Sequence, residues 1–81
     1  MLLFTKKVYS DAIRAGTKLE ETRRGTRYRN VKVGDWLSIN GHFRVQVKSI
    51  ERHDYLETEC YRGKPGPYFI FKFTSPFASR V

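Results

Sequence analysis

Three charged residues at short spacing form the most distinctive chemical group in this sequence. Lys18, Glu21 and Arg23 belong to the segment Gly16–Arg23, which reads Gly-Thr-Lys-Leu-Glu-Glu-Thr-Arg. In an extended chain, residues two apart face the same side, so we expect Glu21 and Arg23 to lie together. Lys18 joins them only if a bulge or turn at Leu19–Glu20 brings it round.

A cation–carboxylate–cation group suits three roles. In a binding site, Lys18 and Arg23 would hold phosphate while Glu21 accepts hydrogen bonds from a base edge. In an enzyme, Lys18 would act as a base or nucleophile when desolvated or placed beside Arg23, and Glu21 would orient water. A purely structural ion-pair network is the third interpretation, since such networks also gather charges.

A run of basic residues overlaps the end of this group. Five positive charges fall within ten residues, and no acid lies among them. They are Arg23, Arg24, Arg27, Arg29 and Lys32. Guanidinium groups bind phosphate well, and the interleaved Tyr28 is expected to offer a face for base stacking. A solvated loop is the structural alternative, and a second, looser basic group lies at residues 61–67.

Composition points to the same class of partner. The chain has 81 residues, with 16 Lys and Arg against 8 Asp and Glu, and a net charge of +8. A pI near 10.0 in one small domain is typical of nucleic-acid binders. The 15% aromatic content indicates a folded chain. We therefore expect a single domain over residues 1–81, too small for large catalytic machinery.

Metal, disulfide and membrane roles are not expected. Cys60 has no second cysteine to pair with, and His42 and His53 do not complete a zinc-ligand pattern with it. His53 could instead serve as a general acid or phosphate contact. The N-terminal apolar run is too short for a signal peptide, and no stretch approaches the ~20 apolar residues of a membrane span. We expect a cytoplasmic protein without a cofactor.

The elements that must position these residues begin with a strand and a helix. Leu2–Phe4 is expected to be a short strand. A helix over Lys6–Ala15 is expected to be capped by Thr5 and ended by Gly16 in a left-handed conformation. Its buried face is predicted to carry Val8, Ala12 and Ile13.

Strands dominate the remainder. A turn at Val33-Gly34-Asp35 leads into a strand over Trp36–Ile39, whose Trp36 is predicted to be core or barrel lining. Asn40-Gly41 predicts a hairpin with an exposed His42. His42–Ile50 alternates as a half-buried strand, and Ser49-Ile50 marks a bulge or its end.

The second half is expected to supply the centre of the sheet. Residues 53–61 are read as either helix or loop. Tyr68–Phe73, apolar on both faces, is predicted to be a central strand, and the residues after Pro76 a loose tail. The fold class is therefore mixed, mainly β with one or two helices, in a small barrel.

The motif and its context resemble a known family. Gly16, Lys18, Glu21 and Arg23 fit the G-x-K-x-x-E-x-R signature of the ASCH (activating signal cointegrator homology) domain family, a branch of the PUA-like superfamily. The preceding strand and helix and the later Val33-Gly34-Asp35 turn fit its order. The resemblance covers residues 2 to about 52. It implies a small PUA-like β-barrel that binds RNA in a cleft.

The resemblance also implies a second function, hydrolysis. Some small bacterial relatives deacetylate an acetylated cytidine, and others cleave RNA. In the deacetylase-like relatives the position matching Glu21 is a threonine and a further carboxylate comes late in the chain, whereas residues 68–81 here contain no acid. This departure weakens the deacetylase reading and leaves ribonuclease chemistry open.

We therefore expect a nucleic-acid-binding module, with RNA or a single strand favoured over duplex DNA. Its alternative is a small metal-independent hydrolase in which Lys18 and Glu21 are catalytic. An acidic protein is a further alternative partner, and no membrane is expected. The predicted contact residues are Lys18, Glu21, Arg23, Arg24, Arg27, Tyr28, Arg29 and Lys32.

Overall fold

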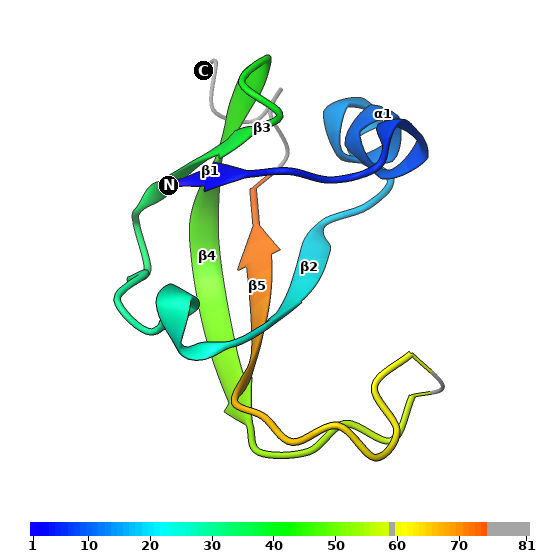
Figure 1. Ribbon diagram of the computed structural model, residues 1–81. Helices are drawn as coiled ribbons and strands as arrows, with labels where there is room; N and C mark the ends of the chain where they lie inside the picture. The colour runs from blue at the N-terminus through cyan, green and yellow to red at the C-terminus, as the bar shows by residue number, and fades with distance from the viewer. Residues whose placement is uncertain (59, 75–81) are drawn as a thin grey trace.

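A computed structural model describes residues 1–58 and 60–74 of the chain (Figure 1). The predicted loose tail lies outside the described residues. The described part is mainly β with one α-helix and one short 3-10 helix, as the sequence predicts. The elements in chain order are β1 (Leu2–Leu3), α1 (Lys7–Ala15), β2 (Glu20–Arg24), η1 (Thr26–Tyr28), β3 (Trp36–Ile39), β4 (Phe43–His53) and β5 (Tyr68–Phe73).

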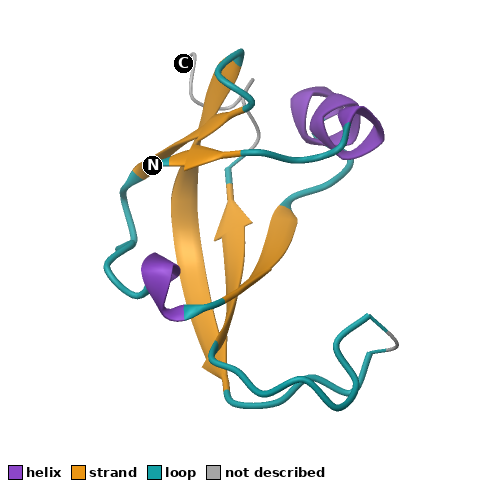
Figure 2. Cartoon of the chain, viewed as in Figure 1, coloured by secondary structure: helices purple, strands orange, loops and turns teal. Residues whose placement is uncertain are grey.

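The five strands form one mixed sheet in the order β1-β3-β4-β5-β2. The first half of β4 pairs with β3, and the second half pairs with β5, with a register shift between Val47 and Ser49. The predicted bulge is therefore confirmed, and the strand continues beyond it. β5 lies between β4 and β2, which confirms its predicted central position. In Figure 2, β1 runs across the direction of β4 and β5, so the sheet is strongly coiled.

The core forms from alternate residues of these strands. β3 directs Leu37 and Ile39 inward, β4 directs Val45 and Val47 inward, and all four side chains are buried. Because side chains alternate along a strand, Trp36 must then face outward. Its side chain is 41% exposed, so the prediction that Trp36 is core is wrong.

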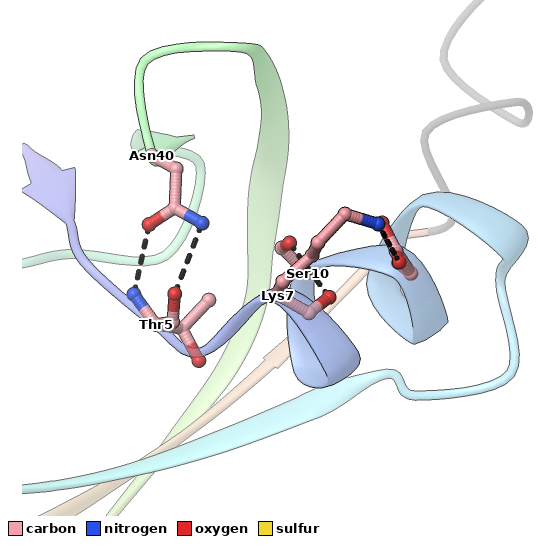
Figure 3. Close-up of polar contacts among 5 residues, drawn as sticks. Thr5, Lys7, Ser10 and Asn40 are labelled. Carbon is pink, nitrogen blue, oxygen red and sulfur yellow. Dashed lines mark hydrogen bonds and ion pairs between the residues drawn. The ribbon is translucent and has the colours of Figure 1, made fainter.

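Helix α1 differs from its prediction at its beginning and along one face. It begins at Lys7, and Lys6 is its N-cap without a side-chain hydrogen bond, so Thr5 is not the cap. Figure 3 shows the reason: the backbone of Thr5 is already paired with Asn40. The Thr5 N–H donates to Asn40 Oδ1 at 2.8 Å, and Asn40 Nδ2 donates to the Thr5 carbonyl at 3.0 Å.

The same helix buries Ser10 and Ile13, whereas Val8 is 67% exposed. The prediction that Val8 lies on the buried face is therefore wrong, because the helix is turned so that Ser10 and Ile13 meet the sheet. The buried hydroxyl of Ser10 has a hydrogen-bond partner, because its Oγ donates to the Lys7 carbonyl at 3.0 Å. The helix ends at Gly16 with φ 82°, the left-handed ending that the sequence predicts.

The predicted hairpin joins β3 to β4. Asn40 and Gly41 both have positive φ, at 53° and 75°, which is the conformation of a type I′ turn. The His42 N–H donates to the Ile39 carbonyl at 3.0 Å and closes the turn, and His42 is exposed as expected. Asn40 thus shapes the hairpin and holds the chain that enters α1.

Candidate nucleic-acid interface

The pair predicted from sequence comes together on β2. Glu21 and Arg23 lie opposite Phe71 and Phe69 of β5, and both point to the same side of the strand. Arg23 Nη2 is 3.6 Å from Glu21 Oε2, and both side chains are largely buried. The expected Glu21–Arg23 pairing is therefore confirmed.

Arg23 also contacts the opposite end of the sheet. Its Nη2 donates to the carbonyl oxygen of Phe4 at 2.8 Å. Phe4 follows β1, and β1 and β2 are the two outer strands of the sheet order. The sheet therefore coils far enough for one side chain to connect its two ends.

An open pocket of about 610 Å³ lies beside this connection. It is formed by the segment from Phe4 into α1, by β2, by η1 and by the loop before β5. Four of its residues are aromatic and three are cationic. Its lining residues are Phe4, Thr5, Lys6, Tyr9, Glu21, Thr22, Arg23, Arg24, Tyr28 and Tyr61.

The Glu21–Arg23 pair has unused hydrogen-bonding capacity. Glu21 Oε2 and Arg23 Nε are buried, and neither has a hydrogen-bond partner among the described residues. The ion pair at 3.6 Å is too long to count as a hydrogen bond. Buried polar atoms are almost always satisfied by protein or by ordered water, so this acceptor and this donor each have capacity for one further partner.

Tyr61 is one of the pocket residues, with Phe4 and Tyr9, that sequence reasoning did not single out. It lies in the loop before β5, where its ring packs edge-on against Tyr68 with 5.0 Å between centroids. Burial raises the pKa of Tyr61 above its ordinary value of 10.0; Cys60 and the Glu21 carboxylate raise it further, and Arg23 opposes them. At neutral pH its phenol therefore remains a hydrogen-bond donor. The only sequence signal was its place at the start of the second basic group.

Lys18 does not join the other two motif residues at the floor of the pocket. Its ammonium lies over the ring of Tyr9, 5.5 Å from the centroid. Tyr9 lines the pocket, so Lys18 supports one aromatic wall through a cation–π contact.

The basic loop differs from its prediction at Tyr28. This side chain is only 7% exposed, and its ring meets Phe71 edge-on with 6.2 Å between centroids. The Arg27 guanidinium lies 5.1 Å from its centroid. The expected open face for base stacking is therefore absent, because η1 turns the ring into the core. Arg24, Arg27, Arg29 and Lys32 are exposed, and Arg24 Nε donates to the Pro65 carbonyl at 2.7 Å.

The remaining sequence candidates stand apart from the pocket lining. His53 is exposed at the end of β4, and Cys60 is an exposed free thiol. Within residues 1–58 and 60–74, no three His, Cys, Asp or Glu side chains gather as a metal site would require. In the same part of the chain, no helix has the length and apolar character needed to cross a membrane.

The chain was compared with protein-family models, with curated proteins and with solved structures, and nothing matched in any of the three comparisons.

Proposed function

We propose that this chain is a nucleic-acid-binding module that takes an unpaired base into the pocket beside β2, with single-stranded RNA favoured. One observation carries the proposal: Glu21 and Arg23 line a pocket with aromatic walls, and Glu21 Oε2 and Arg23 Nε have no hydrogen-bond partner among the described residues. These are the two kinds of group that recognise a base, by its edge and by its face.

The rim of the pocket suits stacking. Phe4 is 71% exposed and Tyr9 is 46% exposed, and both line the pocket. Large aromatic side chains are usually buried, so two exposed rings beside one opening are well placed to receive a base. An unpaired base has two open faces, whereas a base in a duplex is stacked on its neighbours. Single strands are therefore favoured over duplexes.

The edge of such a base would meet Glu21 and Arg23. The carboxylate accepts from a ring or amino N–H, and the guanidinium donates to a ring nitrogen or carbonyl oxygen. Tyr61 adds a neutral donor from the facing loop. A base that pairs with these groups would satisfy polar atoms that have no hydrogen-bond partner in residues 1–58 and 60–74.

Phosphates would be held by the basic residues next to the pocket. Arg24 lines the pocket, and Arg27 and Arg29, both exposed, follow within five residues. Their guanidinium groups are suited to phosphate oxygens, and the net charge of +8 attracts a polyanion from a distance. The binding free energy is therefore expected to depend strongly on salt.

The proposed fold is the small PUA-like barrel of the ASCH family. The motif residues Gly16, Lys18, Glu21 and Arg23 support this assignment, and so does the contact between Arg23 and Phe4 that connects the ends of the sheet. In this proposal Arg23 both closes the barrel and forms the floor of its cleft.

Binding fits the position of Lys18 better than hydrolysis does. The hydrolase alternative places this amine beside Arg23 as a base or nucleophile, but its ammonium lies over the Tyr9 ring. A cation held on an aromatic wall adds positive charge to a binding pocket.

Binding can be tested with fluorescently labelled single-stranded RNA of about ten nucleotides, followed by anisotropy at several salt concentrations. We expect affinity for RNA to exceed affinity for duplex DNA of the same sequence. Phe4→Ala should weaken binding by about fivefold or more through lost stacking. Val8→Ala, an equally exposed apolar change on α1, is the control. Absence of binding to any nucleic acid, or equal loss in both variants, would refute the proposal, and binding to an acidic polypeptide alone would point to a protein partner.

A further inference from the structure

A second surface with an exposed aromatic ring lies on the outer face of β1, β3 and β4. Its side chains point away from the core because the alternate residues of these strands are buried. We call this surface the Trp36 face. It consists of Leu2, Trp36, Ser38, Arg44 and Gln46.

Trp36 and Arg44 form the centre of this face. Trp36 lies opposite Gln46, and Arg44 is its diagonal neighbour, with the guanidinium carbon 5.4 Å from the centroid of the indole. The indole is nevertheless 41% exposed. A planar cation stacked beside an open indole is an arrangement onto which a further flat ring can stack.

The charge of the Trp36 face selects the kind of partner. Arg44 is an exposed cation, and none of the five side chains is acidic. Ser38 and Gln46 add neutral hydrogen-bonding groups. A partner that offers flat rings and negative charge together complements this surface, and a single-stranded nucleic acid offers both.

The chain itself links this face to the pocket. Tyr28 at the end of η1 lines the pocket, and the loop that follows carries Arg29 and Lys32 before it enters β3 at Trp36. Figure 1 shows this loop running from η1 to the start of β3. Two exposed cations, Arg29 and Lys32, and one exposed carboxylate, Asp35, therefore lie along the chain between the two aromatic surfaces.

We propose that the Trp36 face is a second base-stacking surface, which binds the continuation of the single strand whose first base occupies the pocket. The nucleic-acid strand passes along the loop that carries Arg29 and Lys32, and one of its bases then stacks on the indole of Trp36. This inference rests on the proposed function. It predicts that affinity increases with the length of the nucleic-acid strand, because a longer strand also reaches Trp36.

The experiment uses the fact that Trp36 is the single tryptophan of the chain. The full chain is titrated with labelled RNA of three and of twelve nucleotides. Anisotropy of the label reports binding, and tryptophan emission reports stacking at Trp36. We expect both strands to bind and only the longer one to quench the emission. Inorganic polyphosphate, which has charge without bases, should leave the emission unchanged.

Variants separate this surface from the pocket. Trp36→Ala should weaken binding of the twelve-nucleotide strand by about 5- to 100-fold and leave the three-nucleotide strand unaffected, and Trp36→Phe should restore most of the loss. Tyr55→Ala removes another exposed aromatic ring, 77% exposed in the loop after β4, and should have no effect. Circular dichroism checks that each variant is folded.

The outcomes distinguish the two proposals. If the longer strand binds without quenching and Trp36→Ala binds it normally, the second surface is refuted while the pocket stands. If the longer strand quenches Trp36 but Phe4→Ala binds normally, the pocket is refuted as the partner site and the Trp36 face stands as the stacking surface. Quenching by polyphosphate or by polyglutamate to the same extent would overturn base stacking.

Discussion

The guanidinium of Arg23 donates a hydrogen bond to the carbonyl of Phe4 at 2.8 Å, and so joins the two ends of a coiled five-stranded sheet. The same nitrogen lies 3.6 Å from Glu21 Oε2. One side chain therefore connects the outermost strands, balances a largely buried carboxylate and forms part of a pocket. Stability and ligand binding are expected to be coupled at this residue.

Arg23→Ala should lower the free energy of unfolding by about 1–3 kcal/mol, because it removes a hydrogen bond from a charged donor and leaves Glu21 without its counter-charge. Urea unfolding followed by circular dichroism measures the change. The exposed Arg29→Ala is the matched control and should stay within about 0.5 kcal/mol of the parent. Adding Glu21→Gln to Arg23→Ala should recover part of the loss; no recovery would show that the pair is not coupled.

Asn40 should tolerate glycine better than alanine. Its side chain makes two hydrogen bonds to the backbone of Thr5, and its φ of 53° is unfavourable for alanine. Both substitutions lose the hydrogen bonds, at about 1 kcal/mol each, and Asn40→Ala also incurs backbone strain of about 1 kcal/mol or more. Urea unfolding should rank the wild type above Asn40→Gly and Asn40→Gly above Asn40→Ala. The reverse order of the two variants would contradict the role of the turn.

Tyr61 should make the folded state sensitive to alkaline pH. Its pKa is raised by burial and by neighbouring groups, so the folded protein holds this proton more tightly than the unfolded chain. Its contribution to stability is therefore fully present below pH 10 and is lost as the pH rises through the folded-state pKa. Unfolding midpoints measured from pH 8 to 11 should fall more steeply for the wild type than for Tyr61→Phe. Parallel curves would contradict this assignment.

Arg27 and Arg29 should set part of the salt dependence of RNA binding. Each phosphate contact on a single strand contributes about 0.7 to the slope of log affinity against log salt concentration. The double variant Arg27→Ala/Arg29→Ala should therefore have a slope shallower by up to about 1.4. Lys7→Ala/Arg14→Ala removes the same number of charges from α1 and serves as the control. Equal flattening in both double variants would show that only net charge matters.

Local patterns in the sequence predicted most of the fold. Strict alternation predicted a half-buried strand over His42–Ile50, the Asn40-Gly41 pair predicted the hairpin, and Gly16 predicted the end of the helix. Each depends on neighbours within a few residues, where backbone geometry and side-chain periodicity act directly. The position of Tyr68–Phe73 in the centre of the sheet followed from its apolar character on both faces.

Local pattern also paired Glu21 with Arg23, but it did not show what surrounds them. Phe4 and Tyr61 are 17 and 40 residues from Glu21 in sequence, and only the coiling of the sheet and the path of the last loop place them at one pocket. Sequence spacing carries no information about such distant contacts.

Two aromatic residues with wrongly predicted exposure show what the sequence alone did not determine. Its large aromatic side chain made Trp36 a predicted core residue, and a place among basic residues made Tyr28 a predicted stacking residue. The structure exchanges them, since Tyr28 is buried and Trp36 is 41% exposed. The inward positions of β3 go to Leu37 and Ile39, and η1 turns Tyr28 against Phe71. The sequence determined which residues carry rings and charges. Tertiary packing decided which rings remain exposed, because a small core has room for only some of them.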